Sequence, residues 1–161
     1  MAKSSYMGQV KCLIIDDEPL AQDVIERYLN NFSFIELVAK CENAIVALEW
    51  LKKQKIDLIF LDISMPFISG IEFIKTLQNP PLIILTTAHK EFAVESYELS
   101  VLDYLLKPIS FERFLKAINK LDSRASENIK LTNEDPDEIH LRSRQLLPQR
   151  QCRPPPSRLR R

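Results

Sequence analysis

The chain has 161 residues, of which 45% are hydrophobic and 27% charged, a composition that fits one soluble globular domain with a modest tail. No apolar run approaches the roughly 20 residues of a membrane-spanning helix, and the first eight residues do not resemble a signal peptide, so we expect a cytoplasmic protein without a membrane partner. The formal net charge is zero, but residues 1–139 carry an excess of acid, which argues against nucleic-acid binding by this part.

Apolar runs alternate with helical patterns along most of the chain. Strands are predicted over 11–15, 34–39, 58–61, 82–85 and 101–106. Apolar residues at helical spacing predict helices over 20–29, 44–51, 71–77, 92–99 and 111–121. The first, third and fourth strands are continuous apolar runs, as expected for strands buried on both faces of a parallel sheet. This alternation predicts a doubly wound α/β domain.

The periodic pattern ends after Leu121. Residues 122–137 are polar and predict a linker, and residues 138–161 are rich in Arg and Pro, with seven arginines and no acidic residue from His140 onwards. We therefore place the folded domain at 9–124 and a linker with a basic tail at 125–161. The tail is interpreted as a disordered or artificially appended segment, and the alternative is a basic arm for nucleic acid or a Pro-rich ligand.

The three cysteines give no sign of a metal site or a disulfide framework. Cys12, Cys41 and Cys152 are odd in number and widely separated, without metal-ligand spacing. Cys12 and Cys41 lie in apolar, strand-like stretches, which predicts that both are buried free thiols.

Apart from the second strand, which is followed only by Lys40, Cys41 and Glu42, each predicted strand is followed by carboxylate, hydroxyl or ammonium side chains. They are Asp16, Asp17 and Glu18 after the first strand, Asp62 after the third, Thr86 and Thr87 after the fourth, and Lys107 after the fifth. The carboxyl ends of parallel strands meet at one edge of the sheet, where open α/β sheets bind ligands. Clustered carboxylates need a compensating cation, and Mg²⁺ suits oxygen ligands. A carboxylate there is also a competent nucleophile toward phosphorus, with Lys107 and a threonine to hold the phosphate oxygens.

Four segments resemble the signature set of bacterial response-regulator receiver domains. They are 13–18 (LIIDDE), 61–66 (LDISMP) followed by Gly70, 87–88 (TA) and 104–108 (YLLKP), in the family's order and each at a strand end. The resemblance covers most of 9–124. It implies the CheY-like fold, a five-stranded parallel sheet in the order 2-1-3-4-5.

The resemblance also implies a phosphoacceptor and a metal site. Asp62 would accept the phosphoryl group. Asp16 and Asp17 would bind Mg²⁺, together with Asp62 itself and the main-chain carbonyl of Ser64. A simpler interpretation, in which Asp16 and Asp17 only cap the following helix, stays open as an alternative.

Three further residues take roles from the same resemblance. Thr87 would bond the phosphoryl group, Lys107 would pair with it through a side chain that precedes a cis proline bond, and Tyr104 would be the aromatic switch that turns inward when Thr87 moves. Two alternatives stay open: Thr86 could take the place of Thr87, and Tyr104 could be an ordinary core residue.

The family implies a signalling role with a kinase as partner. A sensor histidine kinase would phosphorylate Asp62, and the surface of the fourth helix, fifth strand and fifth helix would then rearrange and alter a partner or homodimer contact. Residues 86–108 look most like receivers of LytTR-type DNA-binding regulators. Too few residues follow the last helix for such an output domain, so DNA would be bound only through a domain missing from this sequence. The chain would catalyse no reaction except its own phosphorylation and dephosphorylation.

Two other functions compete with this prediction. A haloacid-dehalogenase-like phosphatase also forms an aspartyl phosphate, but that family needs a second Asp two residues after its nucleophile, and Glu18 stands at that position after Asp16. A pseudo-receiver that only binds a partner would lack one of the key residues, and none is missing.

Overall fold

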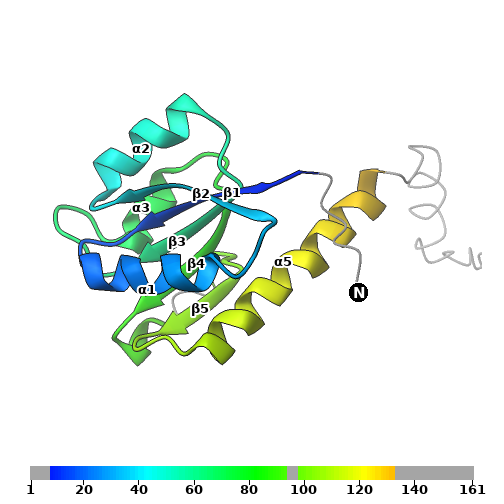
Figure 1. The fold of residues 1–161 in the computed structure, drawn as a ribbon. Coiled ribbons are helices and arrows are strands. Elements are labelled where there is room, and N and C mark those ends of the chain that lie inside the picture. The colour runs from blue at the N-terminus through cyan, green and yellow to red at the C-terminus, as the bar shows by residue number, and fades with distance from the viewer. Residues whose placement is uncertain (1–7, 94–97, 133–161) are drawn as a thin grey trace, which may run out of the picture. The chain divides into compact units, whose positions relative to one another are not determined.

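The structure, a computed structural model, describes residues 8–93 and 98–132, with side chains as far as Leu121. The chain divides into two units, Met1–Ser126 and Glu127–Arg161. The first unit contains a five-stranded sheet with its helices (Figure 1). In the second unit the described residues are the last turns of a helix. The basic tail and Cys152 lie outside the described residues.

The five predicted strands are all present and parallel. They are β1 (Val10–Ile15), β2 (Ile35–Cys41), β3 (Leu58–Asp62), β4 (Leu82–Thr87) and β5 (Asp103–Leu106). The strand order is β2-β1-β3-β4-β5, which confirms the predicted fold class. Every residue of β3 is buried, as its continuous apolar sequence predicts for the central strand. The order also brings the ends of β1 and β3 next to each other.

Two of the described helices begin at residues whose side chains cap them. The described elements are α1 (Pro19–Leu29), α2 (Ala44–Lys53), α3 (Gly70–Thr76), the short 3₁₀ helix η1 (Lys90–Phe92) and α5 (Phe111–Thr132). Asn43 caps α2 by accepting a hydrogen bond from the Val46 amide, and Ser69 and Glu72 form a capping box at α3. The helix predicted over 92–99 falls mostly on residues 94–97, which lie outside the described residues.

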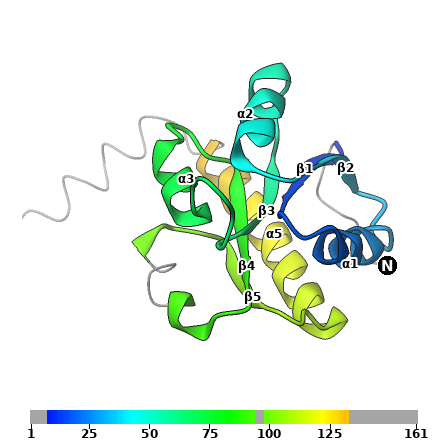
Figure 2. The same cartoon turned by 90° about the vertical axis from the view of Figure 1, so that its left-hand side faces the viewer.

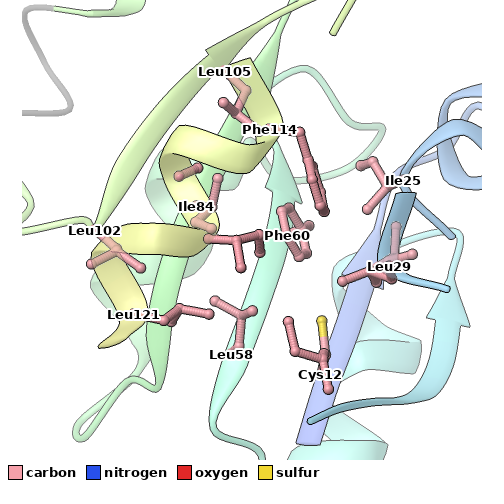
Figure 3. Close-up of a cluster of buried hydrophobic side chains, with 14 of the residues drawn as sticks. Cys12, Ile25, Leu29, Leu58, Phe60, Ile84, Leu102, Leu105, Phe114 and Leu121 are labelled. Carbon is pink, nitrogen blue, oxygen red and sulfur yellow. The ribbon is translucent and has the colours of Figure 1, made fainter. Parts of the chain in front are cut away.

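Helices cover both faces of the sheet. Helices α1 and α5 lie on one face, and α2 and α3 on the other (Figures 1 and 2). Each face has its own buried hydrophobic cluster. Figure 3 shows the cluster under α1 and α5, where the rings of Phe60 and Phe114 stack with centroids 5.4 Å apart. Cys12 and Cys41 are both buried free thiols, as predicted.

Helix α5 is longer than the sequence analysis predicts. Its apolar stripe ends at Leu121, but the helix continues to Thr132, so part of the predicted linker is helical. Residues 122–132 contain no Gly or Pro, the two residues that disfavour a helix most. The domain boundary near residue 124 stays a prediction. No helix among the described residues is long and apolar enough to cross a membrane.

Candidate functional site

Three carboxylates converge at the carboxyl-end edge of the sheet. Oxygen atoms of Asp16, Asp17 and Asp62 all lie within 4.8 Å of one another. Asp16 and Asp62 are 1% and 4% exposed, whereas Asp17 faces solvent. Magnesium is bound by oxygen ligands at about 2.1 Å, so opposite ligands of one ion lie about 4.2 Å apart. Small side-chain rotations would therefore let the three carboxylates share one hard cation, as the sequence predicts.

Lys107 supplies a positive charge to this cluster. Its Nζ donates a hydrogen bond to Asp16 Oδ2 at 2.8 Å and lies 3.7 Å from Asp62 Oδ1. The side chain follows β5, which lies two positions from β3 and three positions from β1 in the sheet. One ammonium group against three carboxylates leaves the cluster negative, which favours a divalent cation or a protonated acid.

The electrostatics single out Asp62. Burial and then the neighbouring Asp16 charge raise the pKa of Asp62 to about 6, and Lys107 and the Ser64 amide oppose this shift only in part. For Lys107, burial lowers the pKa, but the hydrogen bond to Asp16 and the charge of Asp62 outweigh it and raise the pKa above its usual value. Lys107 therefore stays protonated, and it compensates the charge of Asp62 only in part.

The main chain at Asp16 is fixed by its neighbours. The buried Gln22 amide donates to the carbonyl oxygens of Asp16 at 2.6 Å and Cys41 at 3.1 Å, and the Asp16 amide donates to Cys41. Sequence reasoning misses Gln22. The available signal is that Gln22, Ile25 and Leu29 form the buried stripe of α1, where a polar residue needs a partner.

The loop after β3 is held tightly against Asp62. The Gly70 amide donates to the Ile63 carbonyl at 2.8 Å, and a Cβ atom at residue 70 would overlap the Asp62 carbonyl oxygen. Only glycine fits this approach, which explains Gly70 in the sequence motif. The Ser64 amide lies 3.4 Å from Asp62 Oδ1. The proposed role of the Ser64 carbonyl as a metal ligand stays a prediction.

The two threonines of β4 have different surroundings. Thr87 Oγ1 accepts a hydrogen bond from the His89 amide at 3.1 Å. Thr86 is the Cα partner of Asp62 in the β3–β4 ladder, and its Oγ1 has no hydrogen-bond partner among the residues that the structure describes. The choice of Thr87 as the phosphoryl ligand therefore stays a prediction.

Tyr104 joins the Thr87 end of the site to α5. Its hydroxyl donates to the His89 carbonyl, and its own carbonyl accepts from Arg113 Nη2 at 2.8 Å. Arg113 also pairs through both terminal nitrogens with the buried Asp103. The sequence analysis does not find this Arg113–Asp103 pair. The Lys107–Pro108 bond is cis, as the resemblance implies.

Residues 12–119 match the family model described as the response regulator receiver domain. This chain belongs to the receiver family. The sensory transduction protein LytR of Staphylococcus haemolyticus is 42% identical over 74% of this chain and 48% of its own length. The transcriptional regulatory protein BtsR of Escherichia coli K12 is 39% identical over 78% of this chain and 54% of its own. The receiver thus spans about half the length of these curated relatives.

The solved structures agree with this assignment. The crystal structure of the response regulatory domain of mrkE from Klebsiella pneumoniae matches with a TM-score of 0.66 and 34% identity, over 73% of this chain and 98% of that one. The family places the acidic cluster in a phosphoacceptor signalling module of two-component systems rather than in a conventional enzyme. We therefore set aside the phosphatase alternative.

Proposed function

We propose that this receiver accepts a phosphoryl group on Asp62. The observation that carries the proposal is the burial of Asp62 between Asp16 and Lys107, with the cluster left short of positive charge. Asp16, Asp17 and Asp62, with the Ser64 carbonyl, would hold Mg²⁺. Bound Mg²⁺ would neutralise charge on the carboxylate and phosphoryl oxygens. The chain's own residues supply the nucleophile and one fixed ammonium group.

The transfer step follows from these positions. An Asp62 carboxylate oxygen forms a bond to phosphorus, and the bond from phosphorus to the donor's leaving group breaks and gives the electron pair to that group. The donor is a phosphohistidine of a sensor kinase, and its imidazole leaves. Lys107 Nζ, 3.7 Å from Asp62 Oδ1, pairs with the added negative charge. Hydrolysis later returns Asp62 and inorganic phosphate.

The readout runs through Thr87 and Tyr104. Thr87 would leave the His89 amide and bond the phosphoryl group, and Tyr104, which bonds the carbonyl of the same His89, would respond to this movement. The surface around β5 and α5 would then change its affinity for a partner or for a second copy of the receiver.

The whole protein is proposed to regulate transcription. LytR and BtsR, the relatives above, are about twice the length of the region that they share with this chain, and BtsR is named as a transcriptional regulator. We infer a LytTR-type DNA-binding output joined after α5 in a cytoplasmic protein. The receiver itself would contact no DNA.

Intact-mass analysis after treatment with acetyl phosphate tests the acceptor. We expect the wild type to gain one phosphoryl group in Mg²⁺ and none in EDTA, and Asp62→Asn to gain none. Asp23→Asn is the matched control, because Asp23 is an exposed acid whose partner is Lys40. It should be phosphorylated like the wild type.

The opposite result has a definite meaning. If folded wild-type protein gains no phosphoryl group, or Asp62→Asn gains one, Asp62 is not the acceptor. In the first case a pseudo-receiver that binds a partner without phosphorylation becomes the better account.

A further inference from the structure

The buried stripe of α1 contains a polar side chain that donates to two main-chain carbonyl groups. Gln22 is 9% exposed and lies at helical spacing with the buried apolar residues Ile25 and Leu29. Its Nε2 donates to the Asp16 carbonyl at 2.6 Å and to the Cys41 carbonyl at 3.1 Å. The two N–H bonds of one amide group therefore serve two acceptors. An apolar side chain at this position would need no partner, so the buried amide suggests a role beyond packing.

The Asp16 carbonyl belongs to the peptide group that joins two acids of the cluster. Strand β1 ends at Ile15, so this peptide group lies just beyond the strand. Because a peptide group is planar, fixing its carbonyl restricts the backbone angles on both sides, at Asp16 and at Asp17. The Asp16 amide donates to the Cys41 carbonyl at 3.0 Å, the same carbonyl that Gln22 binds. Gln22 therefore restricts the directions in which both acidic side chains leave the main chain.

The Asp16 carboxylate depends on this course of the main chain. Its Oδ1 accepts from the Glu18 amide at 2.9 Å, and its Oδ2 accepts from Lys107 Nζ at 2.8 Å. An aspartate side chain is short, so a shift of the main chain at Asp16 moves the carboxylate with it. Mg²⁺ demands near-ideal octahedral geometry at about 2.1 Å, which leaves little tolerance for such a shift.

We propose that Gln22 is a positioning residue for divalent-cation binding, an inference that rests on the proposed phosphoacceptor function. Its hydrogen bond to the Asp16 carbonyl holds the peptide group that directs Asp16 and Asp17 toward Asp62. The cation then binds without first ordering the segment after β1, which raises its affinity. Gln22 acts through the main chain and contributes no ligand of its own.

Calorimetric titration of the full chain with Mg²⁺ tests this role. Gln22→Met keeps the length of the side chain and removes both donors, and Gln22→Leu removes them in a shorter side chain. Ile25→Val is the matched control, because Ile25 lies in the same buried stripe and belongs to the cluster of Figure 3. We expect both Gln22 variants to bind Mg²⁺ about tenfold more weakly and Ile25→Val to bind it like the wild type. Urea midpoints in EDTA measure the stability of each protein without the ion.

The rate of phosphorylation by acetyl phosphate distinguishes positioning of the ion from an effect on the transfer step. Below the wild-type dissociation constant for Mg²⁺, the rate of Gln22→Met should fall about tenfold, because the occupancy of the site falls by that factor. At saturating Mg²⁺ the rate should approach that of the wild type, because all the ligands are still present. The loss should therefore appear in the Mg²⁺ concentration that gives half the maximal rate.

Other results would overturn the inference in distinguishable ways. Unchanged Mg²⁺ affinity in the Gln22 variants means that the hydrogen bonds stabilise the fold without positioning the acids. An equal loss of affinity in Ile25→Val means that the affinity follows the packing of α1. A rate that stays low at saturating Mg²⁺ means that Gln22 affects the transfer step itself. If the wild type binds no Mg²⁺ and gains no phosphoryl group, the phosphoacceptor function fails first.

Discussion

Two buried aspartates of this receiver have opposite electrostatic surroundings. Asp62 lies at the carboxyl end of β3, where burial and the charge of Asp16 raise its pKa to about 6. Asp103 begins β5, where burial also raises the pKa, but hydrogen bonds from Arg113, the Tyr104 amide and Lys120 outweigh it and lower the pKa below its usual value. Burial alone therefore does not decide the state of an acid: the charge of Asp103 is compensated within the chain, whereas that of Asp62 is compensated only in part.

Removing the compensated acid should have the largest effect on stability. Asp103→Ala leaves Arg113, Lys120 and the Tyr104 amide without their shared acceptor, so we expect a loss of about 2–3 kcal/mol in the free energy of unfolding. Urea denaturation in EDTA measures it. Asp23→Ala, which breaks an exposed pair, should cost under about 0.5 kcal/mol. Equal losses of unfolding free energy in the two variants would contradict the view that Asp103 is held by its buried partners.

Neutralising Asp62 should raise the free energy of unfolding, whereas removing Asp103 should lower it. Without metal, Asp62→Asn removes a buried charge close to Asp16, so we expect a gain of about 1–2 kcal/mol near pH 7.5. The same urea titration in EDTA measures it. A loss of stability would mean that the Asp62 carboxylate is already compensated within the chain.

Magnesium should compensate the charge of Asp62 and so stabilise the folded protein. At ten times its dissociation constant, an ion that binds only the folded state stabilises it by about 1.4 kcal/mol. We expect this gain in the wild type and in Asp23→Asn, and its loss in Asp62→Asn. Thermal unfolding with and without Mg²⁺ measures it. A similar gain in Asp62→Asn would place the ion elsewhere.

Asp62 and Asp103 should affect the folding stability over different pH ranges. The folded pKa of Asp62 lies above its unfolded value of 3.8, so its charge costs stability as the pH rises through 6, by about 1 kcal/mol between pH 5 and pH 7 in EDTA. The folded pKa of Asp103 lies below 3.8, so its contribution is present above that value and is lost below about pH 4. Urea midpoints against pH should show the first slope in the wild type and not in Asp62→Asn.

The sequence predicts more about the surroundings of Asp62, at the carboxyl end of β3, than about those of Asp103, at the start of β5. Strand-end acids can be placed together from the sequence because every parallel strand brings its carboxyl end to one edge. Gln22 and the Arg113–Asp103 pair depend on how α1 and α5 pack against the sheet, which local patterns do not specify. The end of α5 is also missed, because the apolar pattern in the sequence ends at Leu121 whereas the helix continues to Thr132. Side-chain rotation likewise decides the partners of Thr86 and Thr87.

The hydrogen bonds of Gln22 connect the main chain at Asp16 to an edge strand of the sheet. Gln22 holds the carbonyl groups of Asp16 and Cys41 together, and Cys41 ends β2, which has a neighbour on one side only. When β2 opens locally, Asp16 loses its amide acceptor and one of the contacts that fix its carbonyl. Local opening of β2 would therefore release the main chain at Asp16, and the exchange rate of the Asp16 amide hydrogen would measure how often this happens.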